Sequence, residues 1–251
     1  MLKVYLVQMG SLAGEKEKNF SKAREMVLEA SPAPQSLVLL PEMFDTGYVP
    51  QLAKQLSQEN ARPDTPEFLQ KLSDDTNCFV CGGGMRRQEA GVTNHVGIYA
   101  PGKTCETAGY DKNHLFFPEL ETFTAGREIS LFKIRDFCVS TTICFDLRFP
   151  EQYRDATLQG AQLFTVHAAW PAKRKDHWEA LLKARAIENQ AYVAAVNCVS
   201  TDGLYTGDSR IIDPLGNVIV QADAGKEYVV SGEIDINSVN KCRSDFPLFR
   251  Q

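Results

Sequence analysis

Strand-like and helix-like segments alternate along both halves of the chain, and this alternation is the strongest constraint on the fold. Residues 3–9 resemble a strand with two alternating faces, whereas residues 36–42 form an apolar run typical of a strand covered on both faces. Between them, residues 15–30 place Phe20 and Val27 at helical spacing, which predicts an amphipathic helix.

The remaining segments continue these patterns. Helices are expected at residues 65–76, 150–160 and 175–190, and strands at 78–83, 93–101, 141–145, 161–170, 191–199 and 227–236, with a short strand ending at Tyr110 and a hairpin over 209–223. Two apolar strand sets, each with its own helices, predict an α/β fold of two stacked sheets with helices outside, a four-layer α-β-β-α sandwich. A three-layer α/β fold is the alternative.

We see no linker or repeat and therefore expect a single domain over residues 1–251.

The net charge and the N-terminal residues argue against nucleic-acid coating, membrane and secreted proteins. The formal net charge of −5 argues against a protein that coats nucleic acid or an anionic membrane. The first residues lack the pattern of a signal peptide, and no apolar run is long enough to span a bilayer, so we expect a cytoplasmic protein.

The seven cysteines, an odd number, fit reduced thiols better than a disulfide framework. Cys78 and Cys81 have the spacing of some metal and redox sites. They lie in an apolar strand without a second Cys or His pair, so we predict a structural role for both.

Reactive side chains stand where predicted strands end. Glu42 ends the run LVLLPE, Lys112 and Glu119 fall in YDKNHLFFPE, and Cys144 ends TTIC. Because strand ends in α/β frameworks border the cleft above a sheet, we expect these groups to converge.

Thiol, carboxylate and ammonium form a workable set for acyl transfer. Glu42 would accept the proton of the Cys144 thiol, and the positive charge of Lys112 would favour the thiolate and stabilise an oxyanion. The backbone N–H of Phe145 is placed to be a second oxyanion donor. Taken singly, each of these residues is more often structural, so the hypothesis depends on their joint occurrence.

Two alternatives belong to other functional classes. His114 and His167 allow a papain-like Cys–His pair, although the local cysteine signature of such proteases is missing. A non-catalytic binding protein of the same fold is the other alternative.

The motifs LLPEMFDTG, YDKNHLF and ICFDLRFPE resemble those of the nitrilase, or carbon–nitrogen hydrolase, superfamily. The similarity continues through residues 167–197, 207–219 and the tail 245–251. The resemblance implies a sandwich of the nitrilase type, with Glu42 as general base, Lys112 as oxyanion partner and Cys144 as nucleophile. It also implies a second glutamate, matched by Glu119 ahead of the TAG at 124–126, with Glu121 in reserve. No metal or organic cofactor is expected.

Within the superfamily the chain is most similar to the omega-amidase branch, whose substrates are 2-oxo acid amides such as 2-oxoglutaramate and 2-oxosuccinamate. Arg174 is the first candidate for the substrate carboxylate, because the guanidinium fork suits it, with Lys173 and Arg148 as reserves. Trp170 and Phe44 are expected to wall the pocket. N-carbamoyl amino-acid hydrolase, glutaminase-like amidase and nitrilase proper remain alternatives.

The resemblance also implies self-association. Members of the superfamily associate through the helix after the cysteine and through the C-terminal segment. The corresponding segments here are residues 150–160 and the apolar tail FPLFRQ at 246–251. We therefore predict a homodimer.

Overall fold

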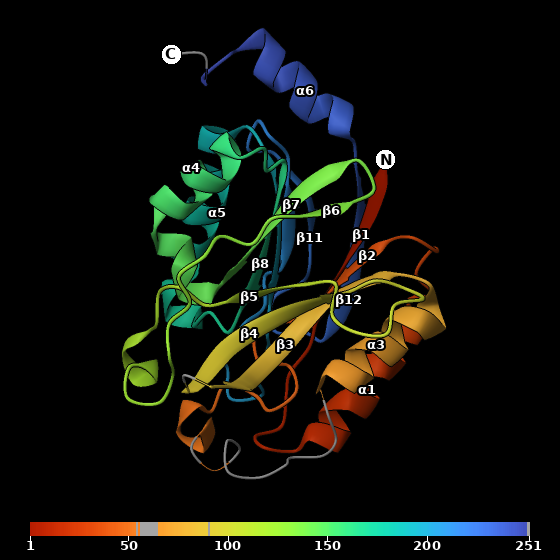
Figure 1. The fold of residues 1–251 in the computed structure, drawn as a ribbon, viewed down its shortest axis with the longest axis vertical. Helices are drawn as coiled ribbons and strands as arrows, with labels where there is room; N and C mark the ends of the chain where they lie inside the picture. The colour runs from red at the N-terminus through yellow and green to blue at the C-terminus, as the bar shows by residue number, and fades with distance from the viewer. Residues whose placement is uncertain (54, 56–64, 90, 250–251) are drawn as a thin grey trace.

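Two mixed six-stranded sheets form the centre of the molecule (Figure 1). The computed structural model describes residues 1–53, 55, 65–89 and 91–249. The first sheet has the strand order β12 (Tyr228–Ile234), β1 (Leu2–Gln8), β2 (Leu37–Leu39), β3 (Phe79–Gln88), β4 (Gly91–Tyr99) and β5 (Ala108–Asp111). β1, β2 and β3 run parallel to one another, and the outer strands pair antiparallel.

The second sheet repeats this plan. Its order is β11 (Val218–Gln221), β10 (Arg210–Ile212), β9 (Tyr192–Asn197), β8 (Leu163–Ala168), β7 (Phe137–Ile143) and β6 (Phe132–Ile134). The three strands β7, β8 and β9 are parallel, again flanked by antiparallel strands.

Helices cover the outer face of each sheet (Figure 1). Among the described residues, α1 (Lys16–Glu29) and α3 (Thr65–Thr76) lie beside the first sheet, α4 (Pro150–Leu158) and α5 (Lys175–Asn189) beside the second, and α6 (Ile236–Asp245) at one end. Short 3₁₀ helices lie at η1 (Pro50–Leu52), η2 (Phe117–Glu119), η3 (Cys144–Arg148) and η4 (Ala172–Arg174). The predicted four-layer sandwich is therefore confirmed, and the three-layer alternative is wrong.

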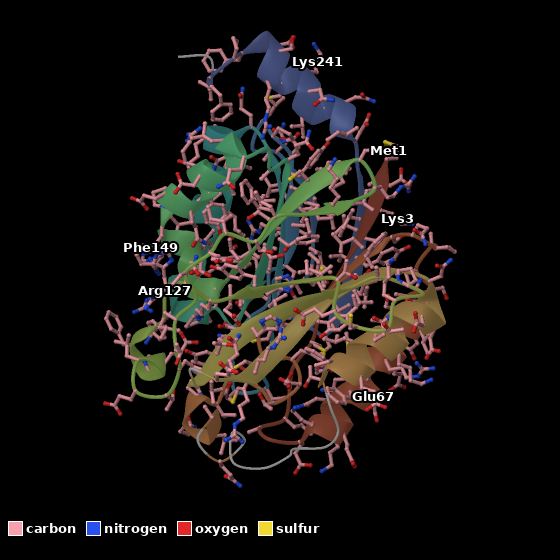
Figure 2. The ribbon with its side chains drawn as sticks, in the orientation of Figure 1. Met1, Lys3, Glu67, Arg127, Phe149 and Lys241 are labelled. Carbon is pink, nitrogen blue, oxygen red and sulfur yellow. The ribbon has the colours of Figure 1, made fainter. Side chains whose placement is uncertain are left out.

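Side-chain alternation along β1 explains how the sheets stack. Leu2, Val4 and Leu6 belong to the core shared with the second sheet, whereas Tyr5 and Val7 belong to the cluster under α1 and α3. Successive side chains on a strand point to opposite faces, so one strand serves both layers. Figure 2 shows side chains filling the space between the sheets. Burying each such aliphatic side chain contributes about 1.5–3 kcal/mol.

The C-terminal helix α6 is missing from the sequence prediction, which ends in a strand over 227–236. The strand ends at Ile234, and Asp235 caps the helix by accepting a hydrogen bond from Asn237 N at 3.1 Å. Only Val239 of α6 is buried, so the segment lacks the apolar stripe that reveals a helix in sequence. Arg243 anchors the helix by donating to Ala161 O at 2.6 Å.

The segments expected at a dimer interface lie on the surface. Leu158 at the end of α4 and Phe246 after α6 are both exposed. The last two residues of the predicted interface, Arg250 and Gln251, lie outside the described residues. Among the helices described, none has the length and apolarity needed to cross a membrane.

Candidate active site

Cys144 lies at the turn between β7 and η3, in a left-handed backbone conformation with φ of +46°. Positive φ is unfavourable for a residue with a Cβ atom, at about 1–2 kcal/mol, so neighbouring contacts must hold the turn. Asp146 supplies them, because its carboxylate accepts hydrogen bonds from Ile143 N at 3.0 Å and from the Tyr110 hydroxyl at 2.8 Å. The turn places the thiol of Cys144, a residue that is 9% exposed, in the lining of a small pocket.

Lys112 links the two glutamates predicted from the sequence. Its Nζ lies 2.8 Å from Oε1 of Glu42 and 2.9 Å from Oε2 of Glu119, and all three side chains are buried. Glu42 follows β2, Lys112 follows β5, and Glu119 ends η2. The backbone N–H of Phe116 donates to Glu119 at 2.6 Å, which orients this carboxylate toward Lys112.

Two further donors orient Glu42, and sequence reasoning missed both. Asn94 of β4 donates through Nδ2 to Glu42 at 2.7 Å and to Glu119 at 3.0 Å. The backbone N–H of Ala169, just after β8, donates to Oε2 of Glu42 at 2.8 Å. Asn94 could have been noticed as a polar residue within a predicted strand. The Ala169 donor could not, because a backbone N–H does not depend on the residue type.

The electrostatics of the cluster keep the thiol protonated at rest. Burial, together with the charge of Glu42, holds the pKa of the Cys144 thiol well above its usual range, although Lys112 opposes the shift. Burial would lower the pKa of Lys112, but the two carboxylates raise it, so the ammonium persists at working pH. Burial also raises the pKa of Glu119, against the opposing effect of Lys112.

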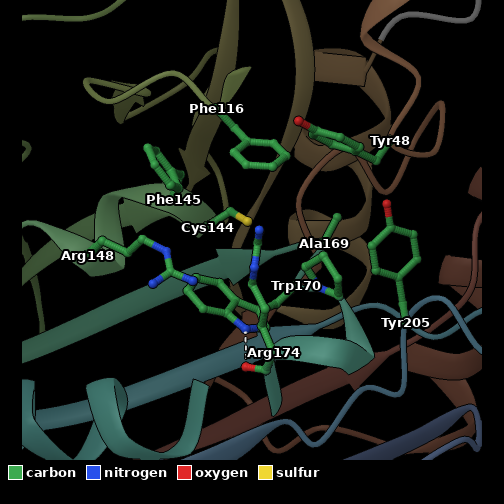
Figure 3. A pocket seen from close by; sticks show the side chains of 10 residues that line it. Tyr48, Phe116, Cys144, Phe145, Arg148, Ala169, Trp170, Arg174 and Tyr205 are labelled. Carbon is green, nitrogen blue, oxygen red and sulfur yellow. Dashed lines mark hydrogen bonds between the residues drawn. The ribbon is translucent and has the colours of Figure 1, made fainter. Parts of the chain in front are cut away.

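A small pocket opens beside the thiol (Figure 3). Its lining consists of aromatic side chains, two arginines and the turn after β8, namely Tyr48, Phe116, Cys144, Phe145, Arg148, Ala169, Trp170, Pro171, Arg174 and Tyr205. The cavity volume is about 60 Å³. The hydroxyl of Tyr48 is buried in this wall without a hydrogen-bond partner in the described residues.

Arg148 and Arg174 bring two positive charges to this pocket, and Figure 3 shows both side chains directed toward it. The guanidinium of Arg148 lies 4.7 Å from the ring of Trp170, and that of Arg174 lies 5.8 Å from the ring of Phe116. Burial and the charge of Arg174 lower the pKa of Arg148. Nη2 of Arg148 lies 3.2 Å from Nδ1 of His177, outside the pocket lining.

Comparison with known proteins assigns the chain to a family. The family model described as Carbon-nitrogen hydrolase matches residues 3–244. The chain belongs to the carbon–nitrogen hydrolase family. It is therefore an enzyme that hydrolyses carbon–nitrogen bonds, and the predicted superfamily is confirmed.

Among curated relatives of this hydrolase, the 2-oxoglutaramate amidase of Bacillus subtilis is 35% identical over 242 residues, covering 94% of this chain and 92% of the relative. The omega-amidase YafV of Escherichia coli is 35% identical over 219 residues, covering 85% and 83%.

Solved structures share the fold. A CN-hydrolase superfamily protein from Xanthomonas campestris, with an arsenic adduct in its active site, has a TM-score of 0.88 at 31% identity and covers 98% of this chain and 95% of its own. Saccharomyces cerevisiae Nit3, a nitrilase superfamily member, has a TM-score of 0.88 at 26% identity, with coverage of 100% and 96%.

Two predicted pocket residues of this hydrolase lie elsewhere. Phe44 is fully buried, and its ring packs 5.9 Å from the rings of Phe20 and Phe68 in the core under α1 and α3. The prediction that it walls the pocket is therefore wrong, because the chain turns after Glu42 and carries Phe44 to the outer face of the first sheet. Lys173 is exposed and does not line the pocket, whereas Trp170, Arg148 and Arg174 do.

The histidines of the alternative Cys–His pair are engaged away from the thiol. His114 Nδ1 lies 2.9 Å from Asp146, and its ring stacks on Phe149 at 3.6 Å. His167 donates from Nδ1 to Leu40 O at 2.7 Å, and burial lowers its pKa to about 4. Neither arrangement leaves an imidazole poised to activate Cys144.

Cys78 and Cys81 are buried free thiols. The Cys78 thiol donates to Ala33 O at 3.3 Å. Among the described side chains, no group of three or more His, Cys, Asp or Glu is arranged to hold a metal ion. Both side chains are fully buried, as expected for the structural role predicted from the sequence.

A second polar cluster occupies the opposite face of β4 from Asn94. His95 lies 2.8 Å from Asp111 and 3.1 Å from Glu106, and Arg86 lies 3.0 Å from Glu106. Burial would lower the pKa of His95, but the hydrogen bonds to Asp111 and Glu106 raise it overall. Burial would raise the pKa of Asp111, but chiefly its bond to His95 lowers it to about 2. Tyr99 also donates to Glu106, at 3.2 Å.

Proposed function

We propose that this hydrolase cleaves the terminal amide of small 2-oxo acid amides, such as 2-oxoglutaramate and 2-oxosuccinamate. The products are the 2-oxo dicarboxylate and ammonia. The names of the Bacillus and Escherichia relatives support this substrate class.

The observation that carries the proposal is the pair of guanidinium groups of Arg148 and Arg174 in the pocket of the Cys144 thiol. A substrate with an amide at one end and a 2-oxo carboxylate at the other needs a nucleophile and an anion site a few atoms apart. An arginine presents parallel N–H donors that match a carboxylate. Arg174 is the proposed primary ligand, while Arg148 adds positive charge and stacks on Trp170.

Acylation begins from the neutral thiol. Glu42 accepts the proton of Cys144 as the sulfur attacks the amide carbon, which opens the C=O double bond to a tetrahedral oxyanion. Lys112 and the N–H of Phe145, which lies in the first turn of η3 where helix N–H groups lack internal partners, stabilise that oxyanion. Glu42 then passes the proton to the departing nitrogen, the C–N bond breaks, and ammonia leaves a thioester on Cys144.

Deacylation reverses the roles at the same groups. Glu42 takes a proton from water, and the resulting hydroxide attacks the thioester carbon. The second oxyanion uses the same two donors. When the C–S bond breaks, the proton returns to the Cys144 sulfur and the acid product is released. Glu119 and Asn94 keep the side chains of Lys112 and Glu42 in position during both steps. The reaction requires no cofactor.

The proposal is tested by measuring ammonia release from 2-oxoglutaramate, 2-oxosuccinamate, glutamine, an N-carbamoyl amino acid and a simple nitrile. Cys144→Ala is assayed beside the wild type. We expect the 2-oxo amides to have the highest kcat/KM and the variant to be inactive. Preference for another compound would refute the substrate assignment, and activity in Cys144→Ala would refute the mechanism. An acyl adduct on Cys144, detected by mass spectrometry after rapid quenching, would support the thioester.

We further propose that the enzyme is a cytoplasmic homodimer acting as one domain. The seven free cysteines support a reducing compartment, and the apolar core common to both sheets supports one domain. Exposed Leu158 and Phe246 support the interface on α4 and the C-terminal segment. Light scattering coupled to size exclusion tests the dimer, and a monomer at micromolar concentration would contradict it.

A further inference from the structure

We infer that Asn197, the last residue of β9, is a positioning residue that holds both ends of the active site through the backbone of Trp170. The inference deepens the proposed function and rests on it, since it assumes that Glu42 is the base and that the arginines bind a carboxylate.

Asn197 forms a clamp that binds the peptide units on both sides of Trp170, which lies two residues after the end of the neighbouring strand β8. Its Oδ1 accepts the Trp170 N–H at 2.7 Å, and its Nδ2 donates to Trp170 O at 3.2 Å and to Gly207 O at 2.8 Å. The side chain is buried, and all three bonds are therefore shielded from water. Only an amide offers an acceptor and two donors at this place, because a carboxylate lacks the donors and an aliphatic side chain lacks both.

The clamp acts on the general base through the residue before Trp170. β8 ends at Ala168, which stands opposite Asn197 in the parallel ladder. Ala169 is the only residue between the end of that strand and the clamped Trp170. Its N–H donates to Oε2 of Glu42 at 2.8 Å, so the clamp fixes the direction of this donor.

The same clamp acts on the anion site through the Trp170 side chain. The indole Nε1 donates to Arg174 O at 2.8 Å, and the guanidinium of Arg148 lies 4.7 Å from the ring. If the Trp170 backbone shifts, the ring and both arginines shift with it. A displacement of about 1 Å in an active site costs up to about 100-fold in rate.

A buried scaffold holds Asn197 itself. The backbone N–H of Asn197 donates to the Ser209 hydroxyl at 3.0 Å, and Ser209 N donates to Gln8 Oε1 at 2.9 Å. Gly207, at φ +74°, approaches Gln8 so closely that a Cβ atom would lie 2.1 Å from it. The clamp is thus tied to β1 of the other sheet.

The test compares Asn197→Ala with wild type on a 2-oxo amide and on an uncharged short amide. Rates are normalised to the fraction of Cys144 that an active-site electrophile titrates, which removes any loss of folded protein. We expect kcat to fall about 10- to 100-fold on both substrates, and KM to rise on the carboxylated substrate alone. Asn197→Leu has a side chain of similar size without the acceptor or the donors, and it provides the same test if the alanine variant does not fold.

Asn189→Ala is the matched control. Asn189 is equally buried, and it donates to Arg185 O at 3.0 Å within α5. We expect its normalised kcat and KM to equal those of wild type. Normalised kcat of the Asn197 variants within about twofold of wild type would overturn the inference, as would an equal loss in Asn189→Ala. If wild type prefers another amide, the substrate assignment fails, whereas the kcat loss on that amide still decides the clamp.

Discussion

Replacing Lys112 with methionine separates what the buried ammonium does for the fold from what it does for catalysis. Lys112 is the positive charge between two buried carboxylates, with N–O distances of 2.8 Å to Glu42 and 2.9 Å to Glu119. Methionine keeps the volume but leaves both carboxylates without a counter-charge. Breaking a buried pair in this way costs about 3–5 kcal/mol of unfolding free energy. Losing one oxyanion donor lowers kcat by about 100- to 1,000-fold.

The pH dependence of this loss has a defined sign. Burial already raises the pKa of Glu119 and Lys112 opposes this, so in Lys112→Met the folded state binds a proton at Glu119 more tightly than the unfolded state does. The variant's deficit is therefore largest at alkaline pH and shrinks as the pH falls and one carboxyl becomes neutral. Adding Glu119→Gln removes one of the two charges, so the double variant recovers at least half of the lost stability without regaining activity.

The assay is urea unfolding followed by the fluorescence of Trp170 and Trp178, with kcat/KM measured on the same preparations. Stability of Lys112→Met within about 1 kcal/mol of wild type at alkaline pH would refute the electrostatic reasoning. So would a deficit that grows on acidification, or a double variant no more stable than the single one.

Three further predictions concern the pocket, the core under α1 and α3, and the polar cluster around His95. Arg174→Ala should lower kcat/KM on a 2-oxo amide by about 10- to 100-fold, through the loss of a charge-assisted hydrogen bond, with little effect on an uncharged amide. Lys173→Ala, exposed one position away, is the control, and equal losses in both would contradict the assignment. Phe44→Ala should lower the unfolding free energy by about 3–5 kcal/mol and leave normalised kcat unchanged. A loss of kcat without a loss of stability would indicate that Phe44 contributes to the pocket. The pKa of His95 is raised in the fold, so its protonation stabilises the protein below about pH 6.5 and this contribution is lost as the pH rises through the raised value. His95→Gln should therefore show a larger deficit in urea unfolding at pH 5.5 than at pH 9, and the reverse order would be inconsistent with the Asp111 contact.

The layers of the fold and the convergence of Glu42, Lys112 and Cys144 could be predicted from the sequence. Both depend on which residue types occur at which positions along the chain. Strand alternation and helical spacing specify which faces are buried, and each reactive group lies within three residues of the end of a strand. Strand ends meet at one edge of a sheet, so residues distant in sequence are expected to be neighbours before any distance is known.

What the sequence could not predict depends on backbone direction. The donor to Glu42 is the N–H of Ala169, and any residue except proline at that position could supply it. The left-handed conformation of Cys144 has no residue signature, since most such positions carry glycine. The sequence suggested that Phe44 walls the pocket. The chain turns after Glu42, and the Phe44 side chain therefore lies on the outer face of the first sheet.

The reacting groups come from different sheets. Glu42, Asn94 and Lys112 stand on strands or strand ends of the first sheet, whereas Cys144 and Ala169 follow strands of the second. In a refolding chain whose two sheets have formed separately, the Cys144 thiol lacks its base, and Glu42 keeps Lys112 and Asn94 but has no thiol to deprotonate. The recovery of activity during refolding therefore reports the moment at which the sheets dock, and far-ultraviolet circular dichroism, which follows strand formation, should recover earlier.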